Sequence, residues 1–121
     1  MKTSSAKNKG RRLQKLVVDK IKEIFSLSDR DVWSTPMGCT GEDVGLSDNG
    51  FIKFPFSVEA KNTEKINIWK SLEQSEQTKR EGTPLLVFKR NNSKVYCTLE
   101  FNYFMELIRR ASEKGTDIKI N

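Results

Sequence analysis

The sequence predicts a mixed α/β fold in which a central sheet of about five strands is flanked by helices. Apolar residues recur at helical spacing in three segments, which are 10–25, 66–80 and 100–113. Short segments of strand type, bounded by turn residues, occur at 32–34, 44–47, 56–61, 85–89 and 95–99. The resulting order is helix, three strands, helix, two strands and helix. It gives each face of a sheet a helix that can cover it.

The length and composition favour one domain with a basic surface. The chain has 121 residues, of which 36% are hydrophobic, enough for a single small core. We expect a basic flexible arm at 1–9, a single domain at 10–115 and a short tail at 116–121. The formal net charge of +6 favours a polyanionic partner such as DNA.

Basic residues are concentrated at the N-terminal end of the chain. No acidic residue precedes Asp19, and the basic residues before it are Lys2, Lys7, Lys9, Arg11, Arg12 and Lys15. A block of this kind is either a phosphate-binding arm or a solvated tail. The candidate DNA-binding residues in it are Lys7, Lys9, Arg11 and Arg12.

Missing residue types and patterns exclude several classes of protein. The chain has no histidine, which excludes Ser-His-Asp and Cys-His hydrolase mechanisms and Cys/His zinc sites. Cys39 and Cys97 lie far apart without Cys-X-X-Cys spacing, so we expect free thiols. The glycine-rich stretch 38–45 lacks the Gly-Lys-Ser/Thr ending of a P-loop, so we expect no nucleotide cofactor. We see no membrane-spanning run and no secretory signal, and we expect a cytoplasmic protein.

The first two helices each have an apolar face. In the first helix one stripe is formed by Leu13, Leu16, Val17, Ile21 and Ile24. In the second helix Ile68 and Leu72 mark the face, and we expect Trp69 to join the core rather than to stack on a base. Lys70, on the same helix, either contacts a phosphate or is an ordinary solvated charge.

The C-terminal part predicts a buried strand, a hairpin and a last helix. The continuous apolar run 85–88 is typical of a buried strand, and Asn91–Ser93 of a hairpin turn. The last helix carries more apolar side chains than one core stripe requires, namely Phe101, Tyr103, Phe104, Leu107 and Ile108. We expect Phe104 and Ile108 to complete the core, and the surplus to form the interface of a homodimer.

The stretch 41–61 organises the rest of the chain. It predicts two strands joined by a turn at Ser47–Gly50, where Asn and Gly tolerate positive φ. Because side chains alternate along a strand, Glu59 and Lys61 share one face of the second strand. A hairpin would then bring Asp43 beside Glu59.

Two carboxylates on a stiff support suit a hard divalent cation. Mg²⁺, for which Mn²⁺ can substitute, prefers oxygen ligands and keeps several waters. Asp43 and Glu59 can supply carboxylates, and the main-chain carbonyl of Ala60 can supply a third oxygen. Lys61 would lie beside the attacking water, where its charge can offset developing negative charge.

Asp43 followed by Glu59-Ala60-Lys61 resembles the signature of the PD-(D/E)XK nuclease superfamily, although Glu42 replaces the Pro of that signature. The resemblance is closest to small phage-encoded, Holliday-junction-resolvase-like endonucleases, and it covers about residues 9–107. It implies a restriction-endonuclease-like core and metal-dependent cleavage of branched DNA. For a phage-encoded protein it implies action in the cytoplasm of an infected or lysogenic host cell.

The resemblance also suggests supporting residues. The family often carries a Glu near the metal on its first helix, and Gln14 stands at about that place, without the charge. The family places a Gln on the helix after Glu-X-Lys, facing the site, and Gln74 matches it. Ser34, before the loop, can contact a phosphate or cap a turn.

Three functions remain open at this point. The first is a Mg²⁺-dependent endodeoxyribonuclease that acts at Holliday junctions or other branched DNA. The second is a flap or nicking nuclease of the same fold, and the third is a non-catalytic DNA-binding module. Paired carboxylates argue against the third, because they would repel phosphate. Only the family resemblance ranks the first above the second.

Overall fold

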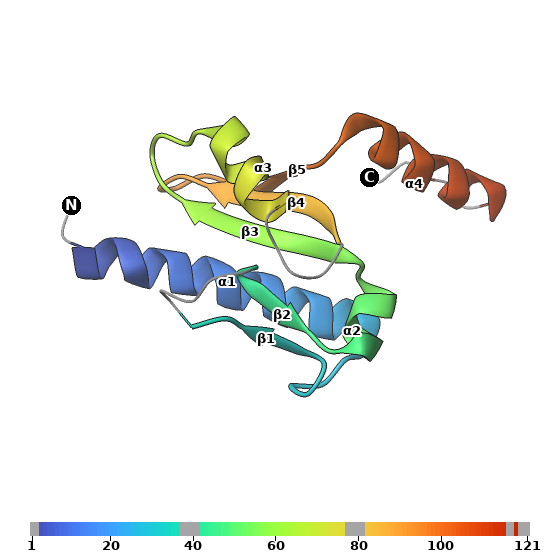
Figure 1. The fold of residues 1–121 in the computed structure, drawn as a ribbon, viewed down its shortest axis with the longest axis horizontal. Helices are drawn as coiled ribbons and strands as arrows, with labels where there is room; N and C mark the ends of the chain where they lie inside the picture. Colours follow the sequence, from blue (N-terminus) through green and yellow to red (C-terminus); the bar gives the residue numbers. More distant parts are fainter. Residues whose placement is uncertain (1–2, 37–41, 77–81, 116–117, 119–121) are drawn as a thin grey trace.

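The computed structural model describes residues 3–36, 42–76, 82–115 and 118. In this part the chain has mixed α/β architecture, which confirms the predicted class (Figure 1). The elements in order are α1 (Thr3–Phe25), β1 (Val32–Ser34), β2 (Val44–Leu46), α2 (Asp48–Lys53), β3 (Phe56–Asn62), α3 (Ile68–Glu76), β4 (Thr83–Lys89), β5 (Tyr96–Thr98) and α4 (Phe101–Glu113).

The five strands form two sheets, whereas we expected one. β1 and β2 make an antiparallel pair, and β4 lies between β3, to which it is parallel, and β5, to which it is antiparallel. The two sheets meet at the free edge of β3, where the backbone N–H of Asp43 donates to the carbonyl of Val58 at 2.9 Å. This contact places the start of β2 beside the middle of β3.

Helices cover both faces of the β3–β4 pair (Figure 1). On the α1 face the buried core consists of Leu13, Val17, Val18, Ile21, Val58, Ala60, Leu85 and Val87. On the other face α3 brings the small buried side chains of Ser71 and Ser75, and Leu86 is fully buried. The predicted buried strand at 85–88 is thus confirmed for Leu85 to Val87, because parallel strands covered on both faces need apolar residues throughout.

The predicted turn at Ser47–Gly50 is wrong, because these residues begin the helix α2. Ser47 is its N-cap, and its hydroxyl oxygen accepts from the N–H of Gly50 at 3.0 Å. The same hydroxyl donates to the carboxylate of Asp31 at 2.7 Å. Ser, Asp and Asn favour N-caps for the reason that they favour turns, since their side chains bond nearby backbone groups. β2 therefore pairs with β1, and no hairpin joins it to β3.

The first helix begins earlier than expected, at Thr3. Residues 3–9 are helical, where we expected the helix to begin at residue 10. Ala6, Lys7 and Lys9 have high or moderate helix propensity, and extending a helix costs far less than starting one. In the described ranges, no helix is long and apolar enough to cross a membrane.

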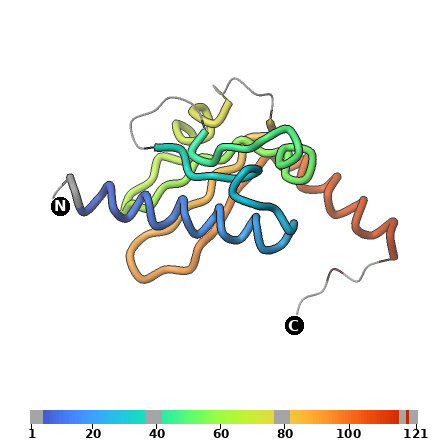
Figure 2. Tube along the Cα trace, turned by 90° about the horizontal axis from the view of Figure 1, so that it is seen from below, coloured from blue at the N-terminus to red at the C-terminus, as the bar shows by residue number. Residues whose placement is uncertain are grey.

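Two expectations about the core are also wrong. Trp69 is 79% exposed at the start of α3, and Phe104 is 44% exposed on α4. α4 has no buried residue, and it extends away from the sheets (Figures 1 and 2). It contacts the body through Tyr103, whose ring packs edge-on against Phe56 at 5.6 Å between centroids. An apolar face on a helix thus does not show that the helix packs on its own chain.

Candidate active site

The structure places Asp43 and Glu59 side by side, although by a different route from the predicted hairpin. The carboxylate of Asp43 accepts from the backbone N–H of Ala60 at 2.7 Å, and its own N–H donates to Val58. These two bonds hold Asp43 across the free edge of β3. Glu59 projects from β3 and is 8% exposed, and its carboxyl group lies close enough to that of Asp43 for each to affect the pKa of the other.

Lys61 completes this cluster from the same strand. Its ammonium lies 3.2 Å from a carboxylate oxygen of Glu59. Glu59 and Lys61 are two residues apart on β3, so their side chains leave the same face. The structure therefore brings together all three residues of the Asp and Glu-X-Lys pattern.

Burial and mutual repulsion shape the acidity of the pair. Burial raises the pKa of Asp43 above its usual range, against the opposing effects of the Ala60 N–H and the Lys61 charge. Burial also raises the pKa of Glu59, and the neighbouring Asp43 charge raises it further, while Lys61 lowers it. Two adjacent carboxylates, one buried and one half-buried, cannot both ionise cheaply without a nearby cation. The pair is therefore suited to a positively charged ligand.

The donor set fits a hard cation such as Mg²⁺. In the described part of the chain no cluster of three or more His, Cys, Asp or Glu side chains is present, so two carboxylates are the anionic donors here. Ala60 can add its main-chain carbonyl oxygen to the donor set. Its N–H donates to Asp43, and because the N–H and C=O of a strand residue point to the same side of the strand, its carbonyl also faces the side where Asp43 lies. Mg²⁺ is often held by one or two carboxylates, with waters at its other positions.

The acidity of the pair predicts how stability depends on pH when no metal is present. Both pKa values are raised in the folded state, so the stabilisation from holding these protons is complete below the unfolded values near 4. It is lost as the pH rises through the folded values. We expect Asp43→Asn to be more stable than the wild type at pH 8 in EDTA, by about 1 kcal/mol, the usual size of a single-substitution effect.

Urea unfolding of both proteins between pH 3.5 and pH 8 measures this difference. The advantage of Asp43→Asn should shrink toward zero at the acid end, where the wild-type pair is protonated. Other carboxylates, such as Glu106 with its pKa lowered to about 2 by Arg109 and Arg110, titrate equally in both proteins and cancel in the difference. A difference that does not change with pH would contradict the prediction.

Gln14 and Ser34 form a supporting pair near Asp43. Gln14 is 4% exposed, and its side-chain oxygen accepts from the hydroxyl of Ser34 at 2.7 Å. Ser34 is the register partner of Val44, and the next residue, Thr35, donates its N–H to the carbonyl of Asp43 at 3.0 Å. The pair therefore links α1 to the strands that carry Asp43, and Ser34 remains exposed to solvent.

Two further candidates share a hollow with Lys61. This hollow, of about 230 Å³, is lined by Lys61, Lys70 and Gln74 together with residues of the β3–α3 connection. The side chain of Asn67 caps α3 by accepting from the N–H of Lys70 at 3.0 Å. The structure thus brings Gln74 and Lys70 to the side of the cluster where Lys61 stands. We call this space the Lys61 hollow.

The N-terminal candidates lie elsewhere. Lys9 and Arg12 line a second hollow on the α1 face of β3, and Lys7 and Arg11 are exposed on α1. Sequence reasoning missed Lys89 and Asn62, which line that second hollow. Lys89 lies two residues beyond the buried Val87, so the two side chains leave the same face of β4. The change from apolar to basic residues along that face was the sequence signal for this hollow. The predicted free thiol is present at Cys97, and Cys39 lies outside the described residues.

Comparisons of the chain with protein-family models, with curated proteins and with solved structures give no match.

Proposed function

We propose that this chain is a metal-dependent endodeoxyribonuclease that hydrolyses phosphodiester bonds in branched DNA. The observation that carries the proposal is the cluster itself: the buried carboxylate of Glu59 beside the half-buried carboxylate of Asp43, with an ammonium 3.2 Å from Glu59, on the edge of a sheet. In a protein that only binds DNA, such a pair would weaken binding, because two carboxylates repel phosphate. It is useful to an enzyme that neutralises phosphate charge at a cation.

Each residue of the cluster has a distinct part in this proposal. Asp43, Glu59 and the carbonyl of Ala60 would hold Mg²⁺, with Mn²⁺ as a substitute. The bound ion would activate the attacking water and offset charge on the phosphate. Lys61 supplies a fixed positive charge beside the reacting phosphate, where negative charge develops. Glu59 holds that ammonium in place through their ion pair.

Neighbouring residues would orient the site and the DNA. Gln14, through Ser34, steadies the strands that carry Asp43. Gln74 and Lys70 line the Lys61 hollow and would contact a phosphate or sugar next to the cleaved bond. The net charge of +6 would draw the DNA to this surface. The order of helices and strands is consistent with a restriction-endonuclease-like core, which we propose for the fold.

We further propose that the active form is a homodimer. α4 presents Phe101, Phe104 and Met105 to solvent, and apolar side chains grouped on an exposed helix are typical of a protein–protein contact. A second copy of the chain would cover this face symmetrically. A two-fold dimer supplies two cleavage sites, which a four-way junction needs because two of its strands must be cut.

A cleavage panel tests the proposed function. We expect the wild type with Mg²⁺ to place paired, symmetric nicks in a four-way junction that cannot branch-migrate, and to act at least about tenfold more slowly on linear duplex. Light scattering should give the mass of a dimer. Preferential cutting of a flap would favour the second nuclease class, and binding without any cleavage would favour a non-catalytic module. A monomer that cuts plain duplex as fast as the junction would overturn the junction specificity.

A further inference from the structure

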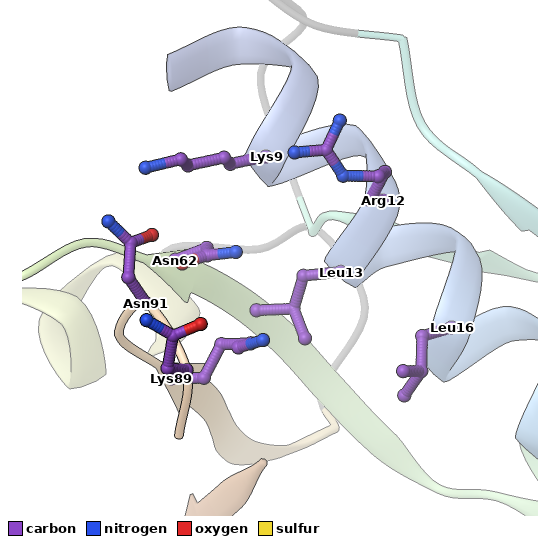
Figure 3. A pocket seen from close by; sticks show the side chains of 8 residues that line it. Lys9, Arg12, Leu13, Leu16, Asn62, Lys89 and Asn91 are labelled. Carbon is purple, nitrogen blue, oxygen red and sulfur yellow. The ribbon is translucent and has the colours of Figure 1, made fainter. Parts of the chain in front are cut away.

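A second hollow lies on the opposite face of β3 from the Lys61 hollow (Figure 3). Its volume is about 580 Å³, within the range of sites that bind small molecules. Its polar lining consists of three cations and three amides, which are Lys9, Arg12, Lys89, Asn62, Asn91 and Asn92. We call it the basic hollow.

The fold holds the walls of the basic hollow in fixed positions. Asn62 and Lys89 are register partners on β3 and β4, so their side chains leave the same face, the one that α1 covers. The N–H of Asn91 donates to the carboxylate of Glu64 at 3.0 Å, which ties the β4–β5 turn to the β3–α3 connection. The buried side chain of Leu13 contributes an apolar part of the wall.

The cations of the basic hollow have no acidic partner in the described part of the chain. Further along α1 the lysines are paired with acids, as Lys15 is with Asp19 and Lys22 is with Asp29. Lys9, Arg12 and Lys89 make no ion pair with any described residue, and none of the lining residues is acidic. Figure 3 shows Lys9 reaching across from α1 and Lys89 extending toward that helix. Three cations that line one hollow without ion-pair partners among the described residues favour an anionic ligand.

Asn62 favours a ligand that also carries a hydrogen-bond donor. Its side-chain oxygen is buried and has no hydrogen-bond partner among the described residues. An unpaired buried acceptor is unfavourable, so a ligand N–H or O–H that this oxygen can reach through a small shift of the side chain gains affinity. A nucleotide has both features, because it carries an anionic phosphate together with the donors of its base. Asparagine side chains commonly pair with base edges.

We propose that the basic hollow binds one nucleotide of a DNA strand, with its phosphate against Lys9, Arg12 and Lys89 and its base edge at Asn62. The choice of DNA as the source of the nucleotide rests on the proposed function. Asn62 directly follows Lys61 on β3, and their side chains point to opposite faces. A strand that leaves the Lys61 hollow around the end of β3 therefore reaches the basic hollow.

The test compares Lys89→Gln with Lys94→Gln, which removes the same charge from an exposed residue outside the hollow. Binding to a labelled single strand and to a labelled junction is measured in EDTA over a range of salt concentrations. Lys89→Gln should weaken binding about tenfold and reduce the slope of log K against log salt by about 0.7 to 0.9. Arg12→Gln, which leaves the sheet untouched, should do the same, and Lys89→Arg should restore most of the affinity.

Different outcomes would contradict the nucleotide site, its assignment to DNA, or the proposed nuclease. Equal affinity and slope for Lys89→Gln, Lys94→Gln and the wild type would overturn the nucleotide site. If Lys89→Gln abolished binding of free deoxyadenosine monophosphate but left DNA binding unchanged, the site would take a free nucleotide, and the assignment to DNA would be wrong. Because binding is measured in EDTA, the result does not depend on cleavage. A protein that binds DNA through Lys89 but never cuts it would keep this site and overturn the nuclease.

Discussion

Replacing Asp43 by Asn should lower the rate of DNA cleavage by about a thousandfold or more while the protein stays folded and binds DNA. The substitution removes one of two anionic ligands from the proposed Mg²⁺ site. Loss of several kcal/mol of charge stabilisation corresponds to about this factor in rate. The Asn side chain keeps the shape of Asp and can still accept from the N–H of Ala60, which lies 2.7 Å from the Asp carboxylate. Glu59→Gln should have the same effect.

Glu73→Gln is the matched control for these two variants. Glu73 is exposed on α3, and its replacement removes one negative charge close to the site without touching the carboxylate pair. It should cut at nearly the wild-type rate in single-turnover assays. In EDTA, Asp43→Asn should bind the junction as tightly as the wild type or more tightly, because less negative charge faces the phosphates. Cleavage by Asp43→Asn or Glu59→Gln at close to the wild-type rate would contradict the assignment of the metal ligands.

Replacing Lys61 by Met should lower the cleavage rate about a hundredfold or more, with a much smaller effect on DNA affinity. The ammonium lies 3.2 Å from Glu59, inside the cluster, and a preorganised charge of this kind is worth about two to three orders of magnitude in rate. Met keeps the length and much of the apolar stem of Lys, so packing along β3 should be retained.

Lys53→Met provides the comparison, since Lys53 is an exposed lysine at the end of α2, away from the cluster. Single-turnover rates at saturating protein separate the chemical step from binding. If Lys61→Met lost cleavage only in proportion to its loss of affinity, Lys61 would be a DNA-binding residue rather than part of the catalytic cluster.

The proximity of Asp43 and Glu59 could be predicted from sequence because Asp43 precedes one short strand and Glu59 lies within the next strand of the chain. The connection between those two strands could not be predicted from sequence. Ser47, Asp48 and Asn49 suit a turn and a helix N-cap equally well, and a helix of six residues is too short to show a 3.6-residue period. The two arrangements differ in which strand β2 joins, yet both bring its first residues to β3.

The basic hollow and the exposed helix α4 lay beyond what the sequence could predict. Lys89 and Asn62 become neighbours only through the parallel register of β3 and β4, which no local pattern specifies. For Phe104 and Trp69, the spacing of apolar residues shows an apolar face but does not say which surface covers it. Local signals therefore predicted the carboxylate pair and the elements other than α2, while their tertiary placement required the structure.

The dependence of cleavage on a divalent cation tests the central claim most directly. A labelled four-way junction is incubated with the wild type in EDTA, and Mg²⁺ or Mn²⁺ is then titrated into the same reaction. We expect no nicking in EDTA, and nicking that rises with the concentration of either ion to a plateau. Equal cleavage in EDTA, or no cleavage of any DNA structure at any concentration of either ion, would contradict a metal-dependent nuclease built on Asp43, Glu59 and Lys61.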